Sequence, residues 1–240
     1  FAPVLRARGQ RIRGDSRASR RRFVRGSPGH SRPSRNVDGP DLRAACRDRG
    51  VDQEGSSYTA FGGPEVLTVA DVECPQPGPG QVRIPVKASG VNPFDWKLRM
   101  GFMPAMVAFP AGTGQDAAGV VTAVGEGVTD VQVGDEVFGN TGNQPAVAEE
   151  AVLAAFAPKP KNLSWEQAGA AGLAAETALR GLRALGLRAG QTLVIDGASG
   201  GVGLAALQFA VEDGLRVIGT SGPAKHALIA QLGGTPSHTL

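Results

Sequence analysis

Residues that bind transition metals or form disulfides are scarce in this chain. Its 240 residues contain two cysteines and three histidines, which are Cys46, Cys74, His30, His226 and His238. Two cysteines cannot form a disulfide framework, so the composition gives no indication of an oxidising compartment. Between residues 58 and 190 there is one cysteine and no histidine. A zinc site built from cysteine and histidine is therefore not expected in that stretch.

Long apolar segments are also missing. No apolar run approaches the roughly 18 residues that indicate a transmembrane helix. The chain does not begin with a charged segment followed by an apolar one, the pattern of a secretion signal. Neither a membrane span nor secretion is predicted, and a soluble cytoplasmic protein is the expectation.

Positive charge is concentrated at one end of the chain. Residues 1–57 hold fourteen arginines against six acidic residues, whereas residues 58–240 hold eleven lysines and arginines against sixteen. The mildly acidic larger part is not expected to bind nucleic acid or an anionic membrane. Residues 1–57 are predicted to be a disordered, arginine-rich extension. Three interpretations stay open: a basic arm for nucleic acid, an organelle transit segment, or translated sequence upstream of the true start, since the chain begins with Phe1.

From residue 58 onward, short apolar segments alternate with turns rich in glycine and proline. Strands are predicted within residues 58–69, 82–91, 117–124 and 131–139. In the second of these, Val82, Ile84 and Val86 share one face. Short strands at this spacing predict a barrel-like β domain over residues 58–163.

The periodicity changes from strand to helix near residue 164. Ser164 and Gln167 form a capping-box pattern, which opens an alanine- and leucine-rich connecting region to residue 187, interrupted near Gly172. Beyond it, the predicted order is a short buried strand, an apolar helix, a second strand and a second helix, at residues 192–196, 202–211, 214–219 and 223–232. This order is the opening of a parallel, doubly wound sheet over residues 188–240.

A glycine-rich loop joins the first strand and helix of this sheet and carries the clearest chemical signal. It reads Asp196-Gly-Ala-Ser-Gly-Gly-Val-Gly. Gly200 allows the backbone to approach a pyrophosphate, Gly203 allows close helix packing, and Ala198 replaces the usual first glycine. Free amides at the helix start suit the phosphates of a dinucleotide. The residues expected to bind the cofactor are Ala198, Ser199, Gly200, Gly201, Val202 and Gly203. The alternative is a structural turn without a ligand.

The end of the second strand bears on the choice of cofactor. NAD-binding proteins commonly place a carboxylate there, about 20 residues on, whereas this chain has Ser221 followed by Lys225. A hydroxyl and an ammonium group accept a 2′-phosphate that a carboxylate would repel. NADPH is therefore the predicted cofactor. Ser221 is also a candidate N-cap for a helix that starts at Pro223, and the two roles are compatible.

Six stretches follow one another in an order typical of a known family. They are Phe61-Gly-Gly-Pro-Glu-Val-Leu, Pro77-Gly-Pro-Gly-Gln-Val, Gly90-Val-Asn-Pro-Phe-Asp-Trp-Lys, Ala117-Ala-Gly-Val-Val, Val133-Gly-Asp-Glu-Val-Phe-Gly and Asp196-Gly-Ala-Ser-Gly-Gly-Val-Gly. Together they resemble the medium-chain dehydrogenase/reductase superfamily, in its zinc-free quinone oxidoreductase (zeta-crystallin-like) branch. The resemblance implies a GroES-like β domain followed by a Rossmann domain, an active site in the cleft between them, and a homodimer for the full-length form.

The resemblance also assigns roles to two single residues. Asn92 corresponds to the family's asparagine near the nicotinamide, and Thr177 to its threonine on the helix that leads to the Rossmann domain. The alternatives are a turn residue before Pro93 for Asn92 and a helix-surface position for Thr177. Where zinc-containing members have Gly-His-Glu, this chain has Gly114-Gln-Asp, so no metal is expected. Lys97 stands where many quinone reductases carry tyrosine, so the substrate-side wall is expected to differ.

The chemistry that follows is hydride transfer from NADPH to a small-molecule acceptor, a quinone or an α,β-unsaturated carbonyl compound. Asn92 is expected to donate a hydrogen bond to the developing oxyanion or to the cofactor ribose, with the final proton taken from solvent. The alternatives are an enoyl-thioester reductase, a nonenzymatic NADPH-binding or structural protein of the crystallin type, and an inactive fragment. The last follows because two Rossmann strands are predicted where about six are common, which indicates a chain truncated at its C-terminus.

Overall fold

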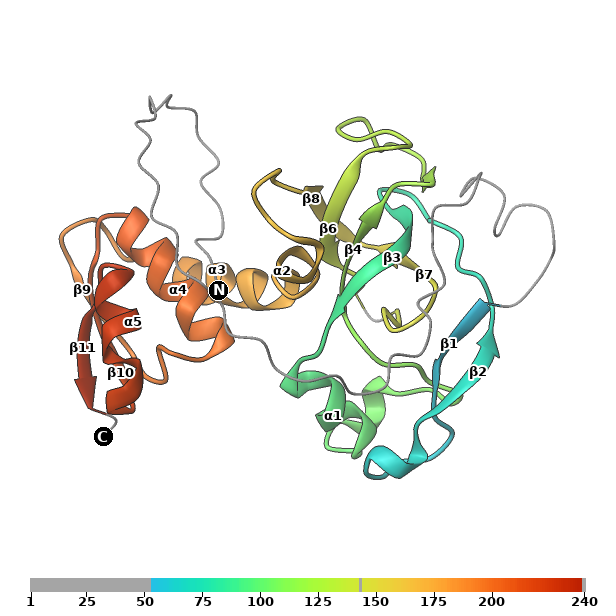
Figure 1. Ribbon diagram of the computed structural model, residues 1–240, viewed down its shortest axis with the longest axis horizontal. Helices are drawn as coiled ribbons and strands as arrows, with labels where there is room; N and C mark the ends of the chain where they lie inside the picture. The colour runs from blue at the N-terminus through green and yellow to red at the C-terminus, as the bar shows by residue number, and fades with distance from the viewer. Residues whose placement is uncertain (1–52, 143, 239–240) are drawn as a thin grey trace, which may run out of the picture.

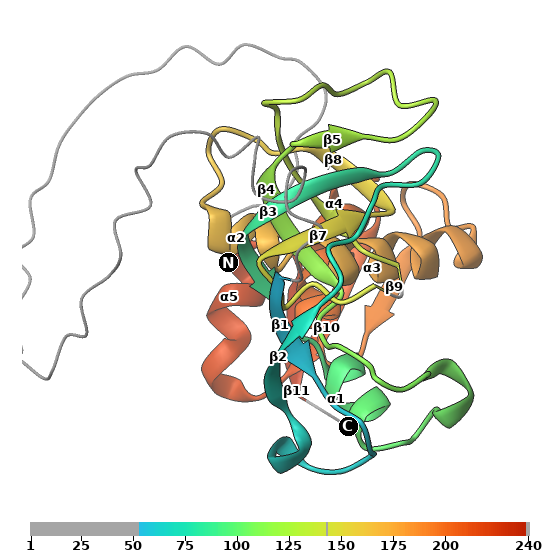
Figure 2. The same ribbon diagram turned by 90° about the vertical axis from the view of Figure 1, so that its right-hand side faces the viewer.

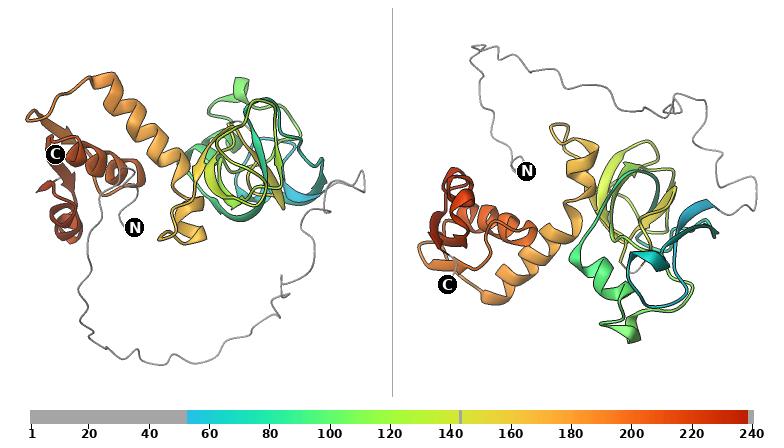
Figure 3. Two further views of the ribbon diagram at one scale, coloured as in Figure 1. Left: turned by 90° about the horizontal axis from the view of Figure 1, so that it is seen from above. Right: turned by 60° about the horizontal axis from the view of Figure 1, so that its bottom comes forward.

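The computed structural model describes residues 53–142 and 144–238 of the chain (Figure 1). These residues form an antiparallel β domain and a smaller parallel sheet with its own helices. Two helices, α2 and α3, connect the two parts (Figures 1 and 3). Most of the predicted disordered extension, residues 1–52, lies outside the described residues. Within the described part of the chain, no helix is long and apolar enough to cross a membrane.

Six strands make the main sheet of the β domain, which curls into a barrel (Figure 2). They are β3 (Val82–Gly90), β4 (Asp116–Val120), β5 (Ala123–Val124), β6 (Glu136–Asn140), β7 (Glu150–Leu153) and β8 (Ala155–Pro158). The path runs β5-β3-β4-β6-β8, with β7 also paired to β3, and all pairs are antiparallel. The predicted β domain is confirmed, although the strand expected at residues 117–124 is divided into β4 and β5.

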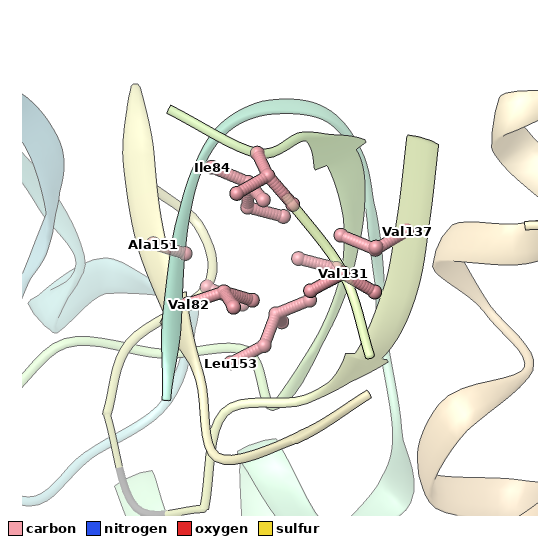
Figure 4. Close-up of a cluster of buried hydrophobic side chains, with 9 residues drawn as sticks. Val82, Ile84, Val131, Val137, Ala151 and Leu153 are labelled. Atoms are coloured by element: carbon pink, nitrogen blue, oxygen red, sulfur yellow. The ribbon is translucent and has the colours of Figure 1, made fainter. Parts of the chain in front are cut away.

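The barrel encloses an apolar core that comes from alternating strand positions (Figure 4). Val82 and Ile84 of β3 are fully buried, and they meet Val137 of β6 and Leu153 of β7 in the same cluster. Alternate residues of a strand point to the same face, so the predicted pattern of β3 places these side chains together. Burying each one contributes about 1.5–3 kcal/mol relative to leaving it exposed. The core thereby fixes β3 and β4, whose paired ends carry polar residues of the candidate site.

The N-terminal hairpin begins earlier than the sequence predicts. β1 (Gln53–Ser57) pairs antiparallel with β2 (Thr68–Val72), so residues 53–57 form a strand and are not part of a disordered extension. The strand was missed because none of its five residues has an apolar side chain. Instead, the buried Gln53 side chain donates to Glu150 O at 3.1 Å and accepts from the Glu150 N–H at 2.5 Å.

Two helices, α2 and α3, follow the predicted local signals, whereas no helix was predicted at the position of α1. α1 (Pro93–Arg99) leaves the end of β3, and α2 (Trp165–Gly169) and α3 (Gly172–Leu185) lead to the parallel sheet. The predicted capping box is confirmed, because Ser164 Oγ accepts from the Gln167 N–H at 3.2 Å and Gln167 Oε1 accepts from the Ser164 N–H at 3.0 Å. The predicted interruption near Gly172 is the break between α2 and α3.

The parallel sheet has the order β11-β10-β9. Its elements are β9 (Thr192–Ile195), α4 (Gly201–Glu212), β10 (Arg216–Ser221), a 3-10 helix (Pro223–Lys225), α5 (His226–Gln231) and β11 (Thr235–His238). The predicted doubly wound parallel order is confirmed, but two details were wrong. A third strand, β11, was not predicted because it contains Pro236 and no large apolar residue. The first strand is not fully buried, since Val194 is 58% exposed.

Close contact between α4 and the glycine loop depends on a missing side chain. A Cβ placed on Gly203 would lie 2.4 Å from Gly197 O and 2.8 Å from Ala198 Cα. A Cβ on Gly201, two residues earlier, would meet no described atom within 4 Å. The packing therefore requires glycine at position 203 and leaves position 201 unconstrained.

We expect Gly203→Ala to lower the free energy of unfolding by about 1–3 kcal/mol, the usual cost of overpacking. Gly201→Ala is the matched control, and it is expected to leave the free energy unchanged or raise it by up to about 1 kcal/mol. Urea denaturation of the two variants and the parent chain measures both effects. Equal destabilisation by the two substitutions would show that the packing of Gly203 is not the constraint.

Candidate functional site

The glycine loop between β9 and α4 is held in shape by the neighbouring strand β10. The Ala198 N–H donates to Thr220 O at 2.9 Å, and the Gly197 N–H donates to Thr220 Oγ1 at 3.1 Å. The Thr220 hydroxyl in turn donates to the Asp196 carboxylate. Gly197 has a φ of +67°, which suits glycine, and Ala198 is fully buried. The alanine therefore fills the turn that the sequence assigned to it.

The start of α4 presents backbone amides on the open side of this loop. The first helical hydrogen bond runs from the Leu204 N–H to Gly200 O at 2.8 Å. The amides of Gly201, Val202 and Gly203 precede it, and an α-helix provides no acceptor for such amides. They coincide with the positive end of the dipole of this twelve-residue helix. The predicted loop residues thus form one surface that suits an anion.

Ser221 and Lys225 lie at the end of β10 and at the end of the 3-10 helix that follows it. Ser221 is the last residue of β10, is 4% exposed, and its hydroxyl donates to Gly222 O at 3.2 Å. Lys225 ends the following 3-10 helix and is exposed. The N-cap interpretation of Ser221 is wrong, because the N-cap is Gly222 and receives no side-chain hydrogen bond. The serine stays in the strand, one residue too early to cap.

Asn92 occupies the N-cap of α1, on the β-domain side of the molecule. Its backbone N–H donates to Asp95 Oδ2 at 2.6 Å, which fixes the start of the helix. Its side-chain Nδ2 donates to Asp116 Oδ2 at 2.8 Å. Asn92 therefore has the local structural role that the sequence allowed, but its amide is also oriented by a partner outside the turn. The second proton on Nδ2 remains for another acceptor.

Asp116 is the residue that the sequence interpretation missed. It begins β4, is fully buried, and its Oδ1 accepts from the Leu173 N–H at the start of α3 at 2.5 Å. Burial raises the pKa of Asp116 to about 6, against the lowering effect of the hydrogen bonds from Asn92 and Leu173. The available signal was its position in Gly114-Gln-Asp, the stretch that corresponds to Gly-His-Glu of the zinc-containing proteins.

Asp95 is a second buried carboxylate at this end of α1. Its exposed fraction is 7%, and burial raises its pKa although the backbone amides of Asn92 and Gly114 lower it. Among residues 53–142 and 144–238, no group of three or more histidine, cysteine, aspartate or glutamate side chains is arranged to hold a metal ion. The two carboxylates instead act on Asn92, one through its backbone and one through its side chain.

The predicted site residues fall into two groups, with α3 between them. The first is Asn92, at the β domain, and the second comprises the glycine loop, Ser221 and Lys225, at the parallel sheet. Thr177 is half-buried on α3 and lies one helical turn after Leu173, on the same face. A small hollow of about 20 Å³ between α3 and α4 is lined by residues that include Ala174 and Gly201. The helix that receives Asp116 at its first turn therefore also borders the start of the glycine loop's helix. Within the second group, Ser221 and Lys225 follow the glycine loop in the chain, at the end of β10 and of the 3-10 helix.

A larger cavity, of about 720 Å³, lies between the β1–β2 hairpin, α1 and the segment from Met106 to Gln115. Its walls include Tyr58, Leu98 and Asp95, but neither Asn92 nor any residue of the glycine loop. Asp95 thus borders this cavity and also contacts Asn92. We place the candidate site at Asn92 and the glycine loop rather than in the larger cavity, because Asn92 offers an oriented side-chain amide and the start of α4 offers backbone amides.

Comparisons with known proteins identify relatives of this chain. Residues 78–180 match the family model described as "Alcohol dehydrogenase GroES-like domain". Quinone oxidoreductase from Rattus norvegicus is 42% identical over 166 residues, which are 68% of this chain and 50% of that protein. Quinone oxidoreductase from Pseudomonas aeruginosa is 41% identical over 182 residues, 73% of this chain and 55% of that protein. The 2-methylene-furan-3-one reductase of Solanum lycopersicum is 37% identical over 195 residues, 74% of this chain and 49% of that protein.

Solved structures give the same assignment. The quinone oxidoreductase of Coxiella burnetii superposes with a TM-score of 0.68 at 32% identity, covering 77% of this chain and 61% of that one. The Escherichia coli quinone oxidoreductase complexed with NADPH gives 0.63 at 30% identity, covering 76% and 57%. The CurK enoyl reductase gives 0.68 at 28% identity, covering 78% and 59%.

The chain spans about half the length of the curated relatives it matches. Within that half, the GroES-like match covers β3 to α3, and the glycine loop follows in the position that the family resemblance gives it. The chain belongs to the medium-chain dehydrogenase/reductase superfamily, in its quinone oxidoreductase branch, and has a GroES-like β domain followed by a Rossmann-type parallel sheet.

Proposed function

We propose that the protein is an oxidoreductase that transfers hydride from NADPH to a quinone or another α,β-unsaturated carbonyl acceptor. The observation that carries this proposal is the set of free backbone amides at the start of α4, beside a loop that β10 holds in shape. The relatives named quinone oxidoreductase, and the Escherichia coli structure complexed with NADPH, support it. When bound, the cofactor supplies the hydride.

The chain offers a separate set of groups to each end of the cofactor. The amides of Ser199, Gly201, Val202 and Gly203 would hold the pyrophosphate. The N–H groups of Ala198 and Gly200 donate to Thr220 O and Gly197 O, so these two residues shape the turn beneath it. A Cβ on Gly200 would meet only Gly197 O, at 3.3 Å, so the approach to this backbone is open. Ser221 and Lys225 would receive the 2′-phosphate, and the absence of a carboxylate at the end of β10 favours NADPH over NADH.

The acceptor end is assigned to Asn92, with Thr177 nearby on α3. The Nδ2 proton that does not bond Asp116 can be donated to the developing oxyanion or to the cofactor ribose. A quinone or enone spreads negative charge onto an oxygen remote from the carbon that is attacked, so one fixed hydrogen-bond donor is a suitable partner. Asn92 would orient and stabilise this oxygen, and the final proton would come from solvent.

A second candidate is reduction of an enoyl thioester, and the likeness to the CurK enoyl reductase favours it. The two candidates share the cofactor and the hydride step and differ in the acceptor. The third possibility is a protein that binds NADPH without turnover. Binding and turnover measurements with two acceptors separate all three.

We expect Lys225→Ala to raise the Kd of NADPH about tenfold, which corresponds to about 1.4 kcal/mol. The reason is the loss of a charge-assisted hydrogen bond to the 2′-phosphate. The Kd of NADH, which lacks this phosphate, should stay the same. Titration of reduced-nicotinamide fluorescence measures both constants.

Lys161→Ala removes another exposed lysine, and it serves as the matched control for the loss of charge. It should change neither Kd. A parent chain that leaves reduced-nicotinamide fluorescence unaltered would contradict the proposed cofactor. An equal rise of both constants in Lys225→Ala would contradict the assignment of Lys225 to the 2′-phosphate.

We expect the parent protein to oxidise NADPH faster with 9,10-phenanthrenequinone than with crotonyl-CoA. We also expect Asn92→Ala to lower kcat with the quinone by about 100-fold, which is the usual effect of losing one oxyanion donor. The Kd of NADPH should change little. Absorbance at 340 nm follows the reaction. Val91→Ala, at the neighbouring position where the side chain is 87% exposed, is the control.

The outcomes separate the candidates. Preference for crotonyl-CoA would favour the enoyl-thioester reductase, and NADPH binding without turnover of either acceptor would favour the nonenzymatic protein. Unchanged turnover in Asn92→Ala would remove Asn92 from the reaction.

A further inference from the structure

The Asp116 carboxylate is a fully buried charged group to which the proposed reaction gives no role. It lies where β4 begins, opposite Gly90 of β3 and Asn140 of β6 in the sheet register. A Cβ on Gly90 would lie 3.0 Å from Asp116 Oδ2, and a Cβ on Gly172 would lie 2.8 Å from Asp116 Oδ1. Two glycines from separate elements thus leave the space that this side chain occupies.

The two oxygens of this carboxylate bind two different parts of the molecule. Oδ2 accepts from the Asn92 side chain at 2.8 Å, and Oδ1 accepts from the Leu173 N–H at 2.5 Å. Leu173 is the second residue of α3, so its amide is one of those that a helix leaves free. A negative charge at that helix end is also favoured by the helix dipole. One side chain therefore joins the N-cap of α1 to the first turn of α3.

We propose that Asp116 is a positioning residue, whose ionised carboxylate holds the Asn92 amide and the first turn of α3 in the arrangement that the reduction step needs. This inference rests on the proposed role of Asn92. An ionised carboxylate accepts both hydrogen bonds at once. An asparagine in its place has only donors on one side and faces a second donor there. A protonated carboxyl group still accepts through its hydroxyl oxygen, but more weakly, so protonation loosens the bond to either the Asn92 amide or α3.

The surroundings of Asp116 make this protonation accessible near neutral pH. Burial raises its pKa to about 6, and the charges of Asp95 on α1 and Glu176 on α3 raise it as well. The facing positions on β3 and β6 are the uncharged Gly90 and Asn140, and α2 contributes the Gly169 backbone beside Gly90. The hydrogen bonds from Asn92 and Leu173 favour the ionised carboxylate at pH 7. None of the facing groups named here is a cation.

The direction of the pH effects follows from the raised pKa. The folded protein binds the Asp116 proton more tightly than the unfolded chain, where the pKa is close to the ordinary 3.8. Through this group, acidification from pH 7.5 to pH 5 therefore raises the stability of the fold. Over the same interval it removes the ionised form on which turnover depends. Stability should therefore begin to rise near the pH at which turnover falls, and continue to rise as the pH approaches 3.8.

The test compares the parent chain with Asp116→Asn and with the control Asp130→Asn, whose carboxyl is exposed. We expect kcat of the parent with the quinone to fall about tenfold between pH 7 and pH 5, with a midpoint near pH 6, as the ionised fraction does. Asp116→Asn should have low kcat and no such midpoint, whereas Asp130→Asn should keep the parent profile. The Tm of the parent relative to Asp116→Asn should rise over the same interval.

A readout that needs neither turnover nor a variant is the side-chain amide resonance of Asn92. In the parent chain its nitrogen-15 shift should titrate with a midpoint near pH 6. A flat shift there, or the same titration in Asp116→Asn, would overturn the inference and point to Asp95 or another group. A chain that neither binds NADPH nor reduces an acceptor contradicts the proposed function, while the Asn92 titration still decides whether Asp116 controls Asn92.

Discussion

The arrangement of the candidate site depends on one buried carboxylate that has to be satisfied by hydrogen bonds. Removing a charge from water is costly unless its oxygens find donors, and Asp116 finds them in the Asn92 amide and the Leu173 N–H. These donors belong to α1 and α3, which are 24 and 57 residues away along the chain. The need to satisfy Asp116 therefore sets the orientation of Asn92 and the point at which α3 begins. α3 in turn packs on α4, whose first turn carries the free amides.

The glycine loop depends on backbone groups rather than on side chains. Its backbone is open to approach because Gly200 and Gly201 carry no side chain, while Gly203 allows the loop to pass directly over the helix. Hydrogen bonds to Thr220, and one within the loop from the Gly200 N–H to Gly197 O at 2.9 Å, fix this backbone. A surface of backbone amides at one end and an oriented side-chain amide at the other are the two parts that the proposed hydride transfer would require.

The features predicted from sequence were those encoded by neighbouring residues. The glycine loop, the capping box of Ser164 and the break near Gly172 depend on residues a few positions apart, so their patterns were sufficient. β1 and β11 were missed because their residues are polar or proline, and long-range pairing rather than apolar alternation makes them strands. Asp116 was missed for the same physical reason, because its role comes from contacts that no local pattern records. Ser221 fitted a cap by type but lies one residue outside the position.

Charge is distributed unevenly between the two ends of the candidate site. The start of α4 offers amides and a positive dipole end, and Lys225 adds a positive charge beyond it. Asn92 itself contacts two carboxylates, Asp95 and Asp116, and Glu176 acts on Asp116 from α3, while Lys97 and Arg99 lie in the last turn of α1. The phosphates of the proposed cofactor would therefore be attracted to the glycine loop rather than to Asn92.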